Sequence, residues 1–317
     1  MRRLIECVPN FSEGRDHNQI EALVAAMSGI KSAWVLDVHS DVDHNRSVVT
    51  LAGEPEPVNE AALRGVGKAA ELIDLRHHRG GHPRIGATDV LPFVPVEGVS
   101  MEDCIALARH AGEEIWARYD VPVYFYEEAA LRSERKSLES VRSGEFEYLR
   151  EEVLRNADRA PDIGGPCLHP SAGAVAVGAR KFLIAYNINL DTPDVSVAKK
   201  IARTIRASNE GLPHVKAIGV ELKDRKLAQV SMNLTDFEQT SIRRVFEAVR
   251  LEARRNGCSI RSSEIVGLVP RKALGPDDAA DLQLENFEPA QKILETRLET
   301  GTNEEAPDGI SLPSVGS

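Results

Sequence analysis

Apolar and polar positions follow two periods along the first half of the chain, and these periods predict a succession of strands and helices. Short apolar runs bounded by turn residues indicate strands, and apolar residues three or four apart indicate helices. The expected strands are Leu4–Val8, Ala33–Val38, Ser47–Ala52, Thr88–Val94 and Val121–Tyr126. The expected helices run through Ile20–Met27, through Val58–Ile73 and from Ser100 to about Tyr119. Ser100 with Asp103 three residues later is typical of a capped helix start.

The second half repeats this order of elements. Its expected strands are Phe182–Leu190, Val215–Leu222, Leu227–Leu234 and Ile260–Leu268. One helix is expected after Thr192 as N-cap with Pro193 as its first residue, and another from Ile242. Strand–helix–hairpin–helix–strand is the split βαβ layout. The predicted fold class is therefore α/β (α+β), with two ferredoxin-like split βαβ subdomains packed together, residues 1–178 and 179–298.

Three connecting segments and the C-terminal tail lack a helix or strand periodicity of apolar residues. Residues 39–45 predict a long polar hairpin loop, and the charge-rich residues 127–159 predict solvated helices that link the halves. Residues 161–180 alternate glycine, proline and small side chains, which is typical of a loop that exposes backbone N–H groups to a ligand. Residues 299–317 are rich in Gly, Pro, Ser and Glu, and we expect a disordered tail there.

Composition restricts the class of protein. The chain has 317 residues, 42% of them hydrophobic and 28% charged, which suits a globular protein with room for two cores. A net charge of −10 argues against a general nucleic-acid binder, although a local basic pocket remains compatible with it. Neither a signal-type apolar segment nor a run of membrane-span length is present, and four scattered cysteines suit reduced thiols. We expect a soluble cytoplasmic protein without a membrane partner.

The stretch Arg-His-His-Arg-Gly-Gly-His-Pro-Arg at residues 76–84 is the strongest candidate site. Its glycines and proline prevent a helix, so His82 lies on a turn between arginines, where an anionic ligand can meet an imidazole that exchanges protons near neutral pH. His78 and His82 are four residues apart, a spacing that brings side chains together only on a helix. We therefore expect no metal.

Two other polar segments leave alternatives open. Asn10 with the following residues 11–14 suits ligand capture between a strand and a helix, and equally an ordinary turn. Residues 39–46 mix acids and bases, which suits the orientation of a catalytic histidine and equally a polar hairpin tip. The chain lacks the motifs of phosphate loops, serine-hydrolase elbows and dinucleotide folds, so those functions have no support.

Seven collinear segments together resemble the glutamate formiminotransferase family. They are ECVPNFSEGRD at 6–16, DHNRSVVTLAG at 43–53, GGHPRIGATDVLPFVPV at 80–96, VPVYFYEEA at 121–129, GARKFLIAYNINL at 178–190, LAQVSMNLTDFE at 227–238 and EIVGLVPRKAL at 264–274. The resemblance implies a homodimeric enzyme that moves the formimino group of N-formimino-L-glutamate to tetrahydrofolate, its co-substrate, in histidine degradation. Animal relatives are fused to a cyclodeaminase domain that this sequence is too short to hold, so the resemblance implies that a separate cyclodeaminase acts downstream.

The resemblance also implies roles for particular residues. It makes His82 the catalytic residue and places folate on the loop before the GARKF strand. The residues implied to bind folate are Ile163, Gly164, Gly165, Pro166, Cys167, Leu168, His169, Pro170, Ser171 and Ala172. Animal members carry a carboxylate where this chain has His39, so the group that orients His82 stays open among Asp37, Asp41 and Asp43.

The residues suit acid–base transfer between two anionic substrates. A neutral imidazole at position 82 accepts a proton from the attacking amine and returns it to the departing nitrogen. Arg76, Arg79 and Arg84 are the expected partners of substrate carboxylates. Two alternatives keep the same ligand: action on 5-formyltetrahydrofolate, as formyl transfer or cyclisation, and a folate-binding module without catalysis.

Overall fold

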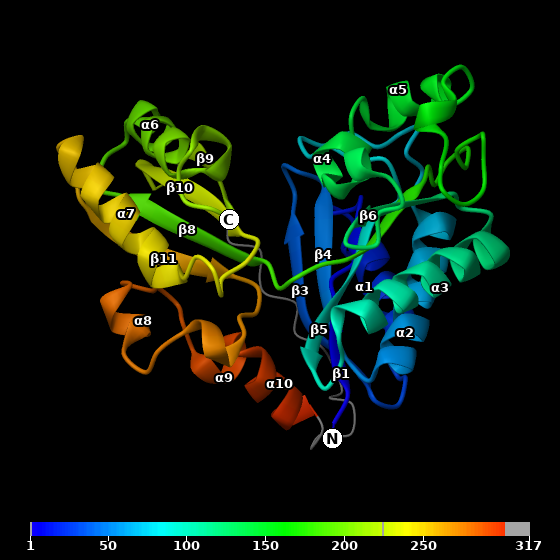
Figure 1. Cartoon of the computed structure of the whole chain (residues 1–317), viewed down its shortest axis with the longest axis horizontal. Helices are drawn as coiled ribbons and strands as arrows, with labels where there is room; N and C mark the ends of the chain where they lie inside the picture. Colours follow the sequence, from blue (N-terminus) through cyan, green and yellow to red (C-terminus); the bar gives the residue numbers. More distant parts are fainter. Residues whose placement is uncertain (1, 224, 302–317) are drawn as a thin grey trace. The chain divides into compact units, whose positions relative to one another are not determined.

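The computed structural model describes residues 2–223 and 225–301, and it divides them into one unit that ends at Arg180 and a second unit, Lys181–Thr300 (Figure 1). The strands of the first unit are β1 (Leu4–Cys7), β2 (Asn10–Phe11), β3 (Ala33–Asp41), β4 (Arg46–Gly53), β5 (Thr88–Glu97), β6 (Val123–Glu127) and β7 (Val175–Ala179). Its helices are α1 (His17–Met27), α2 (Pro55–Leu72), α3 (Met101–Tyr119), α4 (Leu138–Val141) and α5 (Glu145–Glu152), with 3₁₀ turns η1 (Ser133–Lys136) and η2 (Ala157–Arg159).

The first sheet is a split βαβ that two further strands extend. β1 and β2 are successive parts of one line between β4 and β5, and β3 pairs with β4 at the edge. This antiparallel part continues through β5 into the parallel strands β7 and β6. α2 and α3 pack against the sheet and α1 packs against α2, so their apolar stripes form one core with it (Figure 1). The predicted capping box of Ser100 and Asp103 begins α3.

The second unit is a split βαβ on its own. Its strands are β8 (Ile184–Leu190), β9 (Val215–Leu222), β10 (Leu227–Leu234) and β11 (Ile260–Val266). Its helices are α6 (Val195–Ile205), α7 (Ile242–Arg255), α8 (Asp278–Asp281), α9 (Pro289–Lys292) and α10 (Leu294–Gly301), with η3 (Ala207–Asn209) and η4 (Arg271–Ala273). The antiparallel order β11–β8–β10–β9 places the first and third strands at the centre, as the ferredoxin-like layout requires. The α+β class and its two split βαβ subdomains are confirmed.

Several local expectations were wrong. Residues 39–41 are the end of β3, so the hairpin loop contains only residues 42–45, because Arg46–Val48 offer paired backbone partners to the polar residues opposite. Residues 175–179 are the buried strand β7 rather than loop. The N-cap of α6 is Asp194, whose side chain accepts the amide of Ser196 at 2.8 Å, while Thr192 accepts the amide of Asp194. Of the tail expected to be disordered, residues 299–301 belong to α10, and the rest lies outside the described residues.

Residues 127–159 are not solvated linking helices. Val141, Phe146, Leu149 and Val153 are buried, and the Arg135–Asp162 ion pair, at 2.6 Å, is almost fully enclosed. The charge-rich composition hides an apolar side that packs onto the β6 edge of the first sheet. In the described part of the chain, no helix combines the length and the apolar character that a membrane span requires.

The buried ion pair yields a stability prediction. Arg135→Met leaves the carboxylate of Asp162 enclosed without its cation and removes bonds to the carbonyls of Asp158 and Ala160. We expect the free energy of unfolding to fall by about 3–5 kcal/mol, measured by urea unfolding. Arg64→Met, which removes an exposed partner of Glu60, is the control and should cost less than about 1 kcal/mol. Equal losses in both variants would contradict this account of the segment.

Candidate active site

The His82 turn is held at one end of the first sheet by close backbone packing. A Cβ atom on Gly80 would lie 2.2 Å from the carbonyl oxygen of His44, at the tip of the β3–β4 hairpin. The amide of Gly81 donates to the carbonyl of Asp43 at 3.2 Å. The turn is therefore pressed against the hairpin tip, and only glycine permits the approach at position 80.

The chain that follows His82 is tied to the end of the predicted folate loop. The amide of Ala87 donates to Ala172 at 2.9 Å, and the amide of Ala174 donates to Ile85 at 3.0 Å. Gly86 faces Gly173 in the same bridge, where a Cβ on Gly86 would lie 2.1 Å from the carbonyl oxygen of Ala174. Two segments that are distant in sequence thus meet directly after His82.

The loop of residues 163–172 runs along the starts of the parallel strands. Ile163 exchanges backbone hydrogen bonds with Val123 at the start of β6, and Leu168 and Ala172 are buried. Between these anchors Gly165, Pro166 and Cys167 are exposed, and Pro170 is exposed further along. Gly164 lies against the Trp116 ring, where a Cβ would come within 2.7 Å of it.

His82 is a half-buried imidazole with cations around it. Burial is the largest cause that lowers the pKa of His82, and the charges of Arg46 and Arg142 lower it further. The resulting pKa is about 3. The ring is therefore neutral at pH 7. Its ring neighbour is His44, 6.2 Å away between centroids in an edge-on arrangement.

Asp41 is hydrogen bonded to His44 rather than to His82. Its carboxylate accepts the His44 amide at 2.8 Å and lies 2.7 Å from the His44 ring Nδ1. Burial would raise the pKa of Asp41, but these hydrogen bonds outweigh it and lower that pKa. Within the described residues no carboxylate forms a hydrogen bond to His82, so the three aspartates considered from sequence do not include a direct partner.

The arginines expected beside His82 are engaged elsewhere. Arg84 is buried and bonds to Glu145 and to Glu147 at 2.6–3.0 Å, and its Nε donates to His78 at 2.9 Å. Arg76 pairs with Asp74, and Arg79 donates to the carbonyl of His78. For Arg76 and Arg84 the expectation that they await substrate carboxylates is not supported, because carboxylates of the protein already pair with them. For Arg79 the bond to the His78 carbonyl leaves the expectation untested.

His78 has a structural role. Its Nδ1 accepts from Arg84, so its Nε2 carries the proton and donates to the carbonyl of Asn45 at 3.0 Å. Burial lowers the pKa of His78, which keeps the ring neutral. In the described part of the chain, no three His, Cys, Asp or Glu side chains come together as a metal site.

Two other arginines, Arg46 and Arg142, act on His82. The face of the sheet on which Arg46 lies follows from the position of Phe11. Phe11 faces α2, because a Cβ on Gly65, a residue of α2, would lie 3.3 Å from the Phe11 ring. Neighbouring residues of a strand alternate between faces, so Asn10 and Arg46 point to the opposite face, and there Arg46 donates to the side chain of Asn10.

Arg142 follows α4 and forms an ion pair with the buried Asp89, which also accepts the amide of Ile85 at 2.8 Å. Neither arginine was predicted from the sequence as a neighbour of His82. A weak signal existed only for Arg46, at the end of the mixed acid–base segment 39–46.

Comparison with known proteins decides the family. Residues 4–180 match the family model described as the formiminotransferase domain, N-terminal subdomain, and residues 185–288 match the model described as the formiminotransferase domain. The chain belongs to the formiminotransferase family. The resemblance seen in the sequence is thereby confirmed, and the chain is a transferase.

Relatives cover nearly the whole chain. Glutamate formimidoyltransferase of Streptococcus pyogenes serotype M1 is 46% identical over 94% of this chain and 99% of its own length. The protein of the same name from Thermoplasma acidophilum is 45% identical over 95% of this chain and 99% of its own. Formimidoyltransferase-cyclodeaminase of Mus musculus is 45% identical over 86% of this chain and 51% of its own.

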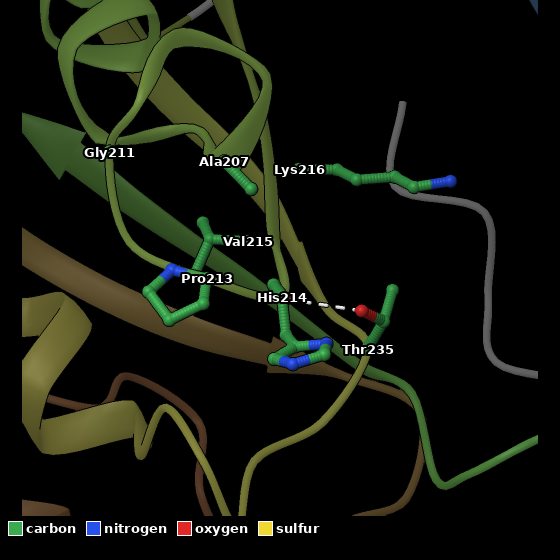
Figure 2. Close-up of a pocket in the computed structure, with 7 residues that line it drawn as sticks. All are labelled: Ala207, Gly211, Pro213, His214, Val215, Lys216 and Thr235. Atoms are coloured by element: carbon green, nitrogen blue, oxygen red, sulfur yellow. Dashed lines mark hydrogen bonds between the residues drawn. The ribbon is translucent and has the colours of Figure 1, made fainter.

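A separate hollow lies in the second unit. Its volume is about 490 Å³, and Figure 2 shows its lining of Ala207, Gly211, Pro213, His214, Val215, Lys216 and Thr235. Thr235 donates from its hydroxyl to the carbonyl of His214 at 3.3 Å, the dashed line of Figure 2. The lining includes none of the residues predicted for the site.

Gly80 and Gly81 provide a matched test of the turn. Gly80→Ala forces the His82 turn away from the hairpin tip, and we expect kcat/KM to fall roughly 10²-fold, because displacements near 1 Å have that effect. Gly81→Ala meets its nearest atom only at 3.7 Å and should retain activity. Circular dichroism checks folding, and an active Gly80→Ala protein would refute the requirement.

Proposed function

We propose that the chain transfers the formimino group of N-formimino-L-glutamate to tetrahydrofolate, giving 5-formiminotetrahydrofolate and L-glutamate, in histidine degradation. The names of its near-full-length relatives support transfer of a formimino group and a glutamate derivative as its donor. The observation that carries the proposal is a neutral, half-buried His82 beside two arginines, on a turn bonded to the end of the loop 163–172. The proposal includes a cytoplasmic homodimer and a separate downstream cyclodeaminase.

His82 performs the proton transfers in this proposal. Its neutral imidazole takes the proton that the pterin amine loses as the new C–N bond forms at the formimino carbon. It then gives that proton to the glutamate nitrogen as the old C–N bond breaks, so no net proton is consumed. Such general acid–base work contributes about 10²–10⁴-fold to a rate.

The loop 163–172 supplies the proposed folate surface. Gly164 and Gly165 have φ values of +80° and +85°, a conformation that suits glycine and leaves the backbone accessible. Within the described chain no hydrogen bond engages the amides of Gly164, Gly165 or Cys167, so these donors can meet carbonyl or carboxylate oxygens of a folate. Buried Leu168 and Ala172 fix the loop for this contact.

Removal of the imidazole tests the mechanism. His82→Ala should lower turnover with formiminoglutamate and tetrahydrofolate by about 10²-fold or more while the fold persists, because the proton acceptor is lost. Glutamate release in a coupled assay is the measurement. His77→Ala removes an exposed histidine of the same segment and should leave the rate unchanged.

Full activity of His82→Ala would remove this residue from the mechanism. Parallel assays with 5-formyltetrahydrofolate separate the transfer of formimino groups from that of formyl groups. Folate binding without turnover for any donor would establish a binding module and contradict the proposal.

The low pKa of His82 predicts the pH dependence of the free enzyme. Because burial and neighbouring cations lower this pKa to about 3, the basic form persists as the pH falls from 8 to well below 6.5. We expect kcat/KM, which reports the free enzyme, to show no acidic limb from His82 between about pH 5.5 and 8. A limb centred near the ordinary histidine value of about 6.5 would contradict this environment.

A further inference from the structure

The half-buried cluster of Arg46 and Arg142 beside His82 contains more positive charge than its protein partners balance. Arg142 pairs with Asp89, whereas among the described residues Arg46 bonds only to the neutral carbonyl of the Asn10 side chain. The Nε atoms of both arginines are buried and have no hydrogen-bond partner in the part of the chain that the structure describes. A guanidinium that is largely withdrawn from water is normally paired with an anion, so the half-buried Arg46 lacks an expected counter-charge.

The electrostatics agree with this imbalance. Burial lowers the pKa of Arg46 to about 10, and the nearby charge of Arg142 contributes in the same direction. Asp89 and Asp41 oppose this effect, yet both carboxylates are already bonded, one to Arg142 and the other to His44. Within residues 2–223 and 225–301 no carboxylate forms an ion pair with Arg46, so an anion bound from outside would supply the missing counter-charge.

Building on the proposed function, we propose that Arg46, supported by Arg142, binds the carboxylate next to the reacting nitrogen of the formimino donor. In formiminoglutamate this α-carboxylate and the reacting nitrogen share one carbon, so an anion site beside the proton-transfer group is where it must lie. The carboxylates of tetrahydrofolate lie beyond its aminobenzoyl group, far from the reacting amine. A two-pronged guanidinium suits a carboxylate.

This binding also activates His82. The groups acting on the imidazole are Arg46 from β4, Arg142 after α4, His44 from the hairpin loop and the backbone of Pro83, while Asp41 acts through His44 and Asp89 through Arg142. An anion on Arg46 offsets the cations that disfavour a protonated imidazole. The pKa of His82 then rises toward the pH at which the enzyme works, and a general base is most effective when its pKa lies near that pH. Binding of the formimino donor thus makes His82 a stronger base.

The test compares Arg46→Gln with the wild type and with Arg76→Gln, a control that removes an exposed arginine paired with Asp74. We expect Arg46→Gln to lower kcat/KM for formiminoglutamate by about 10²-fold, with the KM for tetrahydrofolate changed less than about threefold. The α-amide of formiminoglutamate should be as poor a substrate for the wild type as for the variant. The γ-amide keeps the α-carboxylate and should still distinguish the two proteins.

A second readout does not depend on turnover. L-glutamate, the probe, should bind the wild type and Arg76→Gln in calorimetry and raise the pKa of His82 in an NMR titration, with neither effect in Arg46→Gln. In the variant without ligand, the pKa of His82 should already be higher than in the wild type, because one cation is gone. Arg46→Lys keeps the positive charge but not the two-pronged guanidinium, so it should restore only part of the L-glutamate binding.

The outcomes separate this inference from the proposed function. A wild type that binds glutamate through Arg46 but transfers no formimino group would contradict the function and leave the carboxylate site standing. An Arg46→Gln protein that transfers the group with unchanged donor kinetics and unchanged glutamate binding overturns this inference alone. A loss confined to the KM of tetrahydrofolate would assign Arg46 to a folate carboxylate, which also overturns it.

Discussion

The close packing of residues 80–87 between the β3–β4 hairpin and residues 171–174 is the constraint on which the site depends. Gly80 and Gly86 permit backbone approaches that any side chain would block, and the bonds of Ala87 and Ala174 fix the register of the contact. His82 lies between these fixed points. The same contacts bring it to the hairpin that carries Arg46 and to the loop 163–172.

Electrostatics give this arrangement its chemical character. Removal from water and neighbouring guanidinium groups disfavour the imidazolium form of His82, so the protein itself holds a neutral base in an electropositive environment. Acidic groups could have neutralised the environment, but Asp41 is committed to His44 and Asp89 to Arg142. What remains is a site that favours anionic substrates, within a chain whose overall charge is −10.

Local pattern was sufficient for most elements, and it singled out His82 as the candidate catalytic residue. The hairpin strands Val215–Leu222 and Leu227–Leu234 were predicted with the bounds that the structure has, because alternation and a short turn determine both. β7 was missed because its short run of valine, alanine and glycine lies inside a Gly- and Pro-rich segment. His82 was proposed as a site residue because glycine, proline and charged side chains gather within nine residues.

The partners of the site were not predictable in the same way. Arg142 meets Asp89 across 53 residues, and Glu147 meets Arg84 across 63. No local period encodes such contacts, so the pairing of Arg84 with Glu147 and the position of Arg142 could not be predicted from the sequence. Residues 127–159 were predicted to be solvated because charged residues dominate their composition. The structure shows that their few apolar residues are buried on one side.

A crystal structure of the protein with L-glutamate and 5-formyltetrahydrofolate tests the central claim most directly. The account predicts the N5 region of the pterin within hydrogen-bond reach of His82, about 2.6–3.2 Å, with the folate against residues 163–172 and a glutamate carboxylate on Arg46. A folate bound away from this loop, with the His82 ring remote from N5, would contradict it.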